Sequence, residues 1–215
     1  MKVIGLCGGS GSGKSTVSSF FATHNILPIN TDEIYRNITS HRTECINELE
    51  RAFGAEIINS DGSLNRKKLA PIVYADTEKQ RILNGIAHYY VLNEVRLIIK
   101  EAEKKEYFAV LVDAPLLYES GFDKECDATV AVVADFEKRV ERITTRDGIS
   151  HEEAKGRINS QIPDSELIKK ADYVIYNNAD VEALKEQVSA VVLKINKIKS
   201  EDISYVRKNK GTGNA

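Results

Sequence analysis

The feature that most constrains this chain is a glycine-rich segment near its N-terminus. Residues Gly8–Ser15, GGSGSGKS, fit the pattern G-x-x-x-x-G-K-[ST]. The apolar run Val3–Cys7 precedes this segment, and a helix is predicted over Lys14–His24. Glycines let successive backbone N–H groups turn inward on a phosphate, and the helix N-terminus adds its positive dipole end. The context disfavours a glycine-rich turn without a ligand and predicts a phosphate-binding loop, or P-loop.

The side chains of this loop suggest how a nucleoside triphosphate would be held. Lys14 brings a positive charge to the β- and γ-phosphates, and the hydroxyl of Ser15 can ligate Mg²⁺. The predicted ATP-binding residues of the loop are Gly9, Ser10, Gly11, Ser12, Gly13, Lys14, Ser15 and Thr16.

Four further apolar runs punctuate the chain, and none alternates polar with apolar residues. Runs of this kind are typical of parallel strands covered on both faces, and helical stretches separate them. The sequence therefore predicts an α/β fold of P-loop NTPase type, a doubly wound, five-stranded parallel sheet flanked by helices. The four runs are 26–30, 109–113, 128–134 and 173–177.

The uneven spacing of these runs predicts a single P-loop kinase domain, 1–198, with two insertions. A helical insertion over 36–106 is placed to cover a substrate, and a second insertion over 136–171 is placed as a lid. The sheet core is predicted at 1–35, 107–135 and 172–198, and a flexible tail at 199–215.

Composition excludes several classes of protein. The 215 residues carry a net charge of -2, so no global positive field recruits nucleic acid or an anionic membrane. No apolar run is long enough to span a bilayer. Cys7, Cys45 and Cys126 lie far apart without a CxxC pair, which offers neither a disulfide framework nor a zinc site. Reduced thiols are expected, and the chain is predicted to be cytoplasmic.

A P-loop alone does not define a reaction. The DxxG and NKxD motifs of GTPases are absent from this sequence, and a short chain with two helical insertions suits a small-molecule kinase. The alternative from another class is a nucleotide-gated binding module without phosphoryl transfer.

Two aspartates follow predicted strands, where ligands bind in doubly wound sheets. Asp32 is the candidate base for the acceptor hydroxyl, and its alternative role is a helix N-cap. Asp113 ends a strand, at the usual place of a carboxylate that holds Mg²⁺ through water, and its alternative is a turn residue.

Three arginines are spaced to share one face of a predicted helix. Arg139, Arg142 and Arg146 lie at i, i+3 and i+7, and guanidinium groups stabilise charge on a transferred phosphoryl group. The alternative is a solvated face paired with Glu141 and Asp147.

Several segments together resemble one kinase family. The pattern D-x-PLL-[FY]-E and the order of the segments are specific, whereas the P-loop is widely shared. On these segments the chain resembles the dephospho-CoA kinases, from Val3 to about Leu193. The segments are IGLCGGSGSGKSTV, INTDEI, FGAEIINSDGSLNRKKL, IAHYYV, VDAPLLYESG, ITTRDGIS, RINSQ and ADYVIYNNAD.

The resemblance implies transfer of the ATP γ-phosphate to the ribose 3′-hydroxyl of dephospho-CoA, the last step of CoA biosynthesis. ATP and dephospho-CoA would be the partners, Mg²⁺ the metal, and a monomer the default state. The alternative is a P-loop kinase for another nucleoside or small alcohol. The implied site comprises Lys14, Asp32 and Arg142 for catalysis; Arg142, Arg146 and Asn177 for ATP; Asp32, His88, Asp113 and Leu116 for the acceptor; and Ser15 and Asp113 for metal.

Four positions depart from the family pattern. Asn30 stands at the first acid of the usual D-A-D, and Tyr89 at the proline after the His88 position. Cys7 replaces a threonine before the paired glycines, and Tyr176 replaces an acid before Asn177. Since Lys14 and Asp32 are intact, we expect activity.

Overall fold

The computed structural model describes residues 1–74 and 76–197. Contacts divide the chain into two compact units, and each is described by itself. Of the described residues, the first unit contains 1–29 and 102–197, and the second contains 30–74 and 76–101.

The first unit is built on a five-stranded sheet in the order β2-β3-β1-β4-β5. The β1–β3, β1–β4 and β4–β5 pairs are parallel, which confirms the predicted doubly wound parallel sheet. The runs predicted over 128–134 and 173–177 each end one residue early as strands. The strands are β1 (Lys2–Cys7), β2 (Ile26–Asn30), β3 (Ala109–Asp113), β4 (Ala128–Val133) and β5 (Tyr173–Tyr176).

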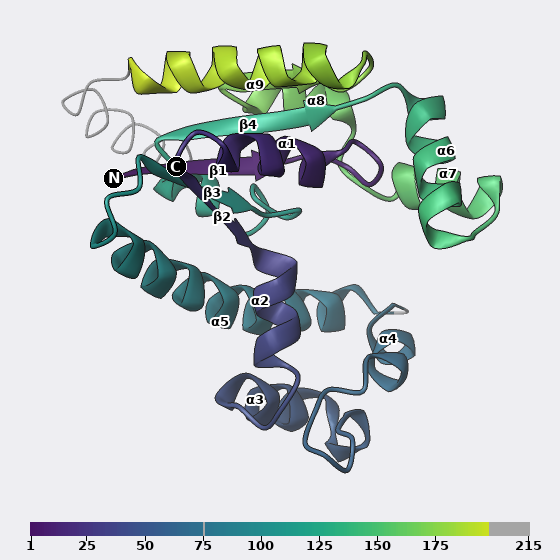
Figure 1. The fold of residues 1–215 in the computed structure, drawn as a ribbon. Helices are drawn as coiled ribbons and strands as arrows, with labels where there is room; N and C mark the ends of the chain where they lie inside the picture. Colours follow the sequence, from purple (N-terminus) through teal and green to yellow (C-terminus); the bar gives the residue numbers. More distant parts are fainter. Residues whose placement is uncertain (75, 198–215) are drawn as a thin grey trace, which may run out of the picture. The chain divides into compact units, whose positions relative to one another are not determined.

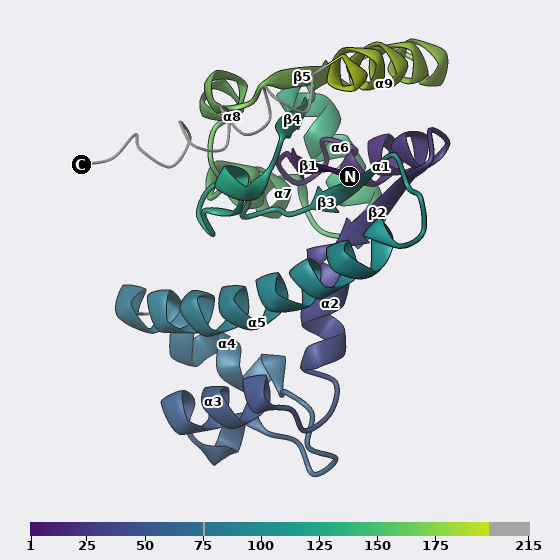
Figure 2. The same cartoon turned by 90° about the vertical axis from the view of Figure 1, so that its left-hand side faces the viewer.

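Helices α1 (Lys14–Ala22) and α9 (Val181–Asn196) lie side by side over one face of this sheet (Figures 1 and 2). Val17 and Phe21 of α1 are fully buried in a core that also holds Leu184 and Val188 of α9. The apolar side of α9 in this core runs from Leu184 to Ile195, whereas Val181 at the start of the helix is 54% exposed. Ile198 and the predicted tail, 199–215, lie outside the described residues.

The opposite face of the sheet is covered by shorter elements. Leu117 and Phe122, the latter opening the 3₁₀ turn η2 (Phe122–Glu125), are fully buried, and α8 (Asp164–Lys170) packs against β4. Gly5 of β1 leaves room for them, because a Cβ there would lie 2.9 Å from a methyl group of Leu117.

Helices α6 (Phe136–Asp147) and α7 (His151–Asn159) form a hairpin beyond the carboxyl end of β4 (Figure 1). Gly148 ends α6 in the left-handed conformation with φ 66°, and Ser150 and Glu153 form a capping box that begins α7. Both are local sequence signals, the first of a helix end and the second of a helix start. The hairpin has a small apolar core of Val140, Ile143, Ala154 and Ile158.

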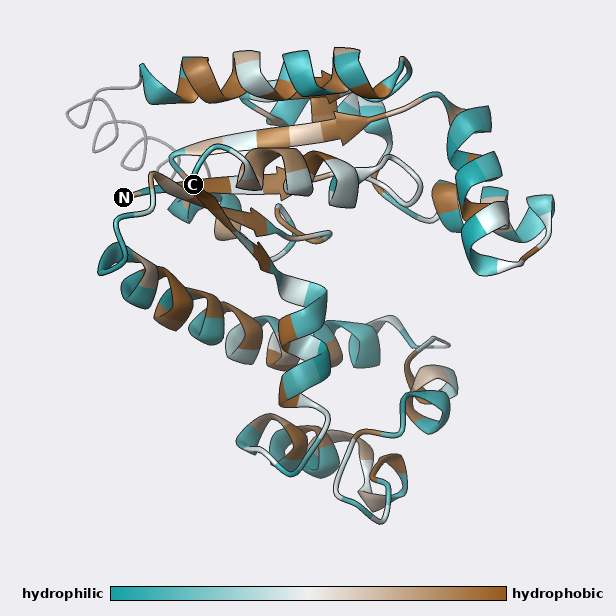
Figure 3. Cartoon of the chain, viewed as in Figure 1, coloured by the Kyte–Doolittle hydropathy of each residue, from teal (hydrophilic) through white to brown (hydrophobic). Residues whose placement is uncertain are grey.

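The second unit is helical, and Figure 3 shows apolar and polar residues alternating along its helices. Its apolar side chains form a core of their own that includes Ile46, Leu49, Phe53 and Ile57. Its elements are α2 (Thr31–Ile38), α3 (Glu44–Phe53), η1 (Ala55–Ile57), α4 (Arg66–Tyr74) and α5 (Thr77–Glu103), the last of which ends in the first unit.

Cys7, Cys45 and Cys126 are all buried, and none of the three forms a disulfide bond. Within residues 1–74 and 76–197, none of the helices combines the length and the apolar character needed to cross a bilayer.

Candidate functional site

The P-loop joins β1 to α1. Gly13 is the N-cap of α1 and offers no side-chain cap. Gly11 and Gly13 have φ of 76° and 92°, a conformation that side chains other than that of glycine seldom adopt. Among the described residues, no protein acceptor takes a hydrogen bond from either backbone N–H. These donors are therefore available to an anion at the start of α1.

The cationic side chain of the loop lies folded across it. Lys14 Nζ donates a hydrogen bond of 2.9 Å to the carbonyl oxygen of Gly8. Ser15 and Thr16, the next two residues of α1, are exposed at its first turn. A phosphate bound by the loop would meet the ammonium group and the hydroxyl of Ser15 together.

Asp113 lies at the same end of the sheet as the P-loop. It is the last residue of β3 and is in register with Leu6 of β1, and Ala114 N donates 3.0 Å to Leu6 O. Leu116 follows in the next turn and is 41% exposed. Parallel strand order therefore brings this carboxylate beside the loop, as sequence reasoning anticipated.

Cys7 is the last residue of β1 and directly precedes the P-loop. Burial raises the pKa of its thiol to about 12, against the opposing influence of a hydrogen bond with Tyr118 and the charge of Lys14. The carboxylates of Glu119 and Asp113 are also within electrostatic range of the thiol. The thiol therefore stays protonated at neutral pH and adds no charge next to the loop.

The hydroxyl of Ser15 and the carboxylate of Asp113 supply the oxygen donors that Mg²⁺ prefers. Within residues 1–74 and 76–197, no group of three or more His, Cys, Asp or Glu side chains could hold a metal.

Arg142 reaches from α6 to the P-loop. Its Nη1 donates 3.2 Å to Gly11 O, and its Nη2 donates 3.0 Å to Asn177 O. Asn177 is buried and donates from Nδ2 to Ser12 O at 2.8 Å. Two predicted nucleotide-binding residues, Arg142 and Asn177, are thus joined to the loop and to each other.

The three arginines predicted to share a face meet different environments. Arg139 is 4% exposed and pairs with Asp164 at 2.8 Å. The Arg146 side chain is 62% exposed and pairs with Asp147, as the alternative reading of this helix proposed. The hydrogen bond from Arg146 is the main cause that lowers the pKa of Asp147 to about 2.

Asp32 and His88 belong to the second unit. Asp32 is exposed in the first turn of α2, and the N-cap of that helix is Asn30, whose side chain accepts from Glu33 N at 3.1 Å. The alternative role of Asp32 as the N-cap is therefore wrong. His88 is half-buried on α5.

Sequence reasoning missed a set of contacts that hold the outside of the P-loop. Gln161, in the turn after α7, accepts from Ser10 N at 2.8 Å and donates to Ser10 Oγ at 3.1 Å. The segment RINSQ carries Gln161, yet nothing in its local pattern indicates a partner 151 residues away.

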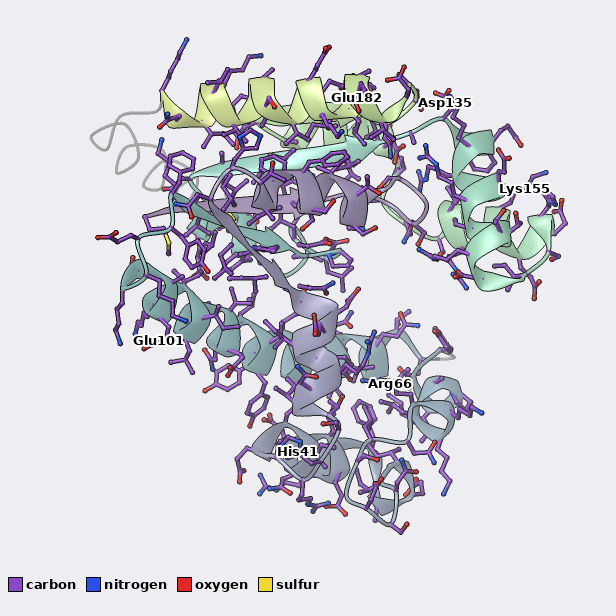
Figure 4. The ribbon with its side chains drawn as sticks, viewed as in Figure 1. His41, Arg66, Glu101, Asp135, Lys155 and Glu182 are labelled. Atoms are coloured by element: carbon purple, nitrogen blue, oxygen red, sulfur yellow. The ribbon has the colours of Figure 1, made fainter. Side chains whose placement is uncertain are left out.

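A second set of hydrogen bonds lies between the end of β4 and the start of α6. Asp135, labelled in Figure 4, accepts from Asn178 Nδ2 at 2.6 Å, and its N–H donates 2.8 Å to Asn178 Oδ1. Lys155, also labelled there, lies on α7 and faces away from the sheet. The reciprocal bonds hold the start of α6, and with it Arg139 and Arg142, against the segment that carries Asn177.

A parallel sheet of this order, an uncapped helix after a glycine-rich loop, and a lysine over that loop define a P-loop nucleotide-binding protein of the kinase class. The comparisons with known proteins then name the family. The family model described as dephospho-CoA kinase matches residues 2–183, so the chain belongs to the dephospho-CoA kinase family.

Individual relatives agree with the family model. A dephospho-CoA kinase of Fusobacterium nucleatum is 41% identical over 186 residues, covering 86% of this chain and 94% of the relative. A solved structure from Thermus thermophilus is 32% identical with a TM-score of 0.75, covering 90% of this chain and 97% of that one. The dephospho-CoA kinase from Campylobacter jejuni, at 24% identity, TM-score 0.65 and coverage of 91% and 97%, supports the fold.

Proposed function

We propose that this kinase transfers the γ-phosphoryl group of ATP to the ribose 3′-hydroxyl of dephospho-CoA, giving CoA and ADP. The observation that carries the proposal is the P-loop with the open N–H groups of Gly11 and Gly13, in a chain that matches the family model over residues 2–183. The alternative acceptors, another nucleoside or a small alcohol, have no observation in their favour.

The residues of the first unit account for nucleotide binding. The N–H groups of the loop would bind the β-phosphate, and the ammonium of Lys14 would move from Gly8 O to the phosphates. Arg142 would stabilise the charge that develops on the transferred group. We propose that Asn177 and Arg146 contribute to the binding of ATP.

Ser15 and Asp113 would hold Mg²⁺, which offsets the negative charge of the phosphates when bound.

The residues of the second unit account for the acceptor. Asp32 would accept the proton of the 3′-hydroxyl as its oxygen bonds to the γ-phosphorus and the bond from that phosphorus to the β-phosphate oxygen breaks. We propose that His88 contacts dephospho-CoA, as do Leu116 and Asp113.

The insertion over 36–106 is proposed to bind the acceptor, and the region 136–171 to close over ATP and exclude water. A cytoplasmic monomer stays a prediction.

The experiment is ADP release from the full chain with Mg²⁺ and ATP, in the presence and absence of dephospho-CoA. We expect ADP only with the acceptor, CoA identified by mass, and loss of both with Lys14→Ala. ATP binding without acceptor-dependent ADP would contradict the proposal. A panel of nucleosides and pantothenate derivatives would then show whether the acceptor is a different alcohol or whether the chain only binds nucleotide.

A further inference from the structure

The outer side of the P-loop is held by a set of polar contacts centred on Ser10. The carbonyl oxygen of Ser10 accepts from Arg139 Nε at 2.8 Å, and its N–H donates to Gln161 Oε1 at 2.8 Å. Its hydroxyl accepts from Gln161 Nε2 at 3.1 Å. All three polar groups of this one residue are therefore bonded to side chains that follow β4 in the chain.

The two side chains that hold Ser10 are themselves fixed. Arg139 Nη1 pairs with Asp164 Oδ1 at 2.8 Å, and Arg139 Nη2 donates to Gln161 Oε1 at 3.3 Å. Because Arg139 is almost fully buried, Asp164 provides the opposite charge that its guanidinium requires there. The group Ser10, Arg139, Gln161 and Asp164, here called the Ser10 clamp, is a closed network.

The P-loop packs closely against Arg139. A Cβ on Gly9 would lie 2.1 Å from Arg139 Nη2, and a Cβ on Gly11 would lie 2.7 Å from Arg139 O. Both glycines thus let the loop approach the backbone and side chain of Arg139. A movement of the loop away from Arg139 would break the bonds to Ser10.

The clamp occupies the polar groups of Ser10 and leaves the N–H groups of Gly11 and Gly13 without a protein acceptor among the described residues. A donor array for a phosphate is effective when its geometry is fixed before the ligand arrives.

We propose that Gln161 and Arg139 are positioning residues for the β-phosphate. They act through Ser10, which they hold so that the backbone N–H groups of the P-loop keep the geometry that phosphate binding requires. This inference rests on the proposed function only in taking a nucleoside phosphate as the ligand of the loop. Neither residue is assigned a contact with the nucleotide.

The test compares ADP, which carries a β-phosphate, with AMP, which does not. Dissociation constants are measured by titration calorimetry on the full chain with Mg²⁺ and without acceptor. In Gln161→Ala, which leaves the Arg139–Asp164 pair intact, we expect the ADP constant to rise about tenfold, the equivalent of one lost hydrogen bond, and the AMP constant to stay near that of the wild type.

Two variants make this result specific. Gln161→Glu keeps an acceptor oxygen for Ser10 N and Arg139 Nη2, and should restore most of the preference for ADP. Asp127→Asn alters a buried carboxylate that accepts from Val3 N at 2.7 Å, at the amino end of β1, and should lower the unfolding temperature without changing the ADP to AMP ratio.

The outcomes separate the possibilities. If Gln161→Ala lowers thermal stability and leaves the ratio of the two constants unchanged, the role of Gln161 is structural and the proposal is overturned. If the wild-type chain binds ADP but phosphorylates no dephospho-CoA, the proposed function is wrong. The effect of Gln161→Ala on the ratio of the ADP and AMP dissociation constants still tests the role of the Ser10 clamp.

Discussion

Asn177 lies so close to Gly13 that a Cβ on the glycine would be 2.0 Å from Asn177 Nδ2. The same amide group donates to Ser12 O at 2.8 Å, so the segment after β5 is fastened to the P-loop at the residue that begins α1. The last glycine of the motif therefore serves the packing of the protein as well as the approach of a phosphate.

Gly13→Ala should abolish most of the activity. The substitution combines a strained φ of 92° with a clash against Asn177, which must displace the loop. A displacement near 1 Å lowers kcat/KM by about a hundredfold. Steady-state kinetics of Gly13→Ala and the wild type would measure this fall in kcat/KM.

Gly156→Ala is the matched control, because a Cβ there meets nothing within 4 Å inside α7. It should leave activity unchanged and stabilise the helix by up to ~1 kcal/mol. Equal losses of activity in the two variants would show that the contact with Asn177 is irrelevant.

Asp32→Asn should lower turnover by about 10²–10⁴, as expected when a general base is removed. Because Asn30 caps α2, the substitution should leave the unfolding temperature nearly unchanged. ADP affinity, measured by calorimetry, should be retained. Glu33→Gln, one position along the same exposed turn, is the comparison variant and should keep near-normal turnover. Normal turnover in Asp32→Asn would remove it from the role of base.

Asp164→Ala should destabilise the chain by about 2 kcal/mol or more, because it leaves the buried guanidinium of Arg139 without its counter-charge. Urea unfolding would measure the difference. Glu166→Ala, on the same helix, removes an exposed partner of Lys169 and should have little effect, since water screens that pair. Two equal, small changes would mean that Arg139 does not depend on Asp164.

Stability above pH 9 should depend on Cys7. Its thiol has a pKa of about 12 in the folded chain against an ordinary value of 9.0, so the folded state holds this proton more tightly. The contribution is complete below pH 9 and is lost as the pH rises toward 12, by at most ~1.4 kcal/mol per pH unit. Unfolding free energy should therefore fall less steeply between pH 9 and 10.5 in Cys7→Ala than in the wild type. Identical slopes would refute the assigned pKa.

Local patterns were sufficient to predict the architecture. The three inner strands β1, β3 and β4 are largely apolar runs, as expected for strands buried on both faces of a parallel sheet, whereas the edge strands β2 and β5 are only partly buried. Gly148 and the Ser150 capping box marked helix ends because the chemistry of caps is confined to a few adjacent residues. Local chemistry was ambiguous at α2, where Asn30 and Asp32 are both good caps, and the extended backbone of Asn30 (φ -99°, ψ 112°) decides between them.

The sequence by itself determined the P-loop, the parallel sheet and the family, because each depends on residues adjacent in the chain or on the order of short motifs. Only the tertiary structure decided the environments of Arg139, Arg142 and Arg146, which helical spacing makes equivalent. Arg139 is buried in the Ser10 clamp, Arg142 contacts the P-loop at Gly11, and Arg146 forms an exposed ion pair with Asp147. Their environments differ because the partners of the first two, Ser10 and Gly11, lie 129 and 131 residues away, and folding alone brings them within reach.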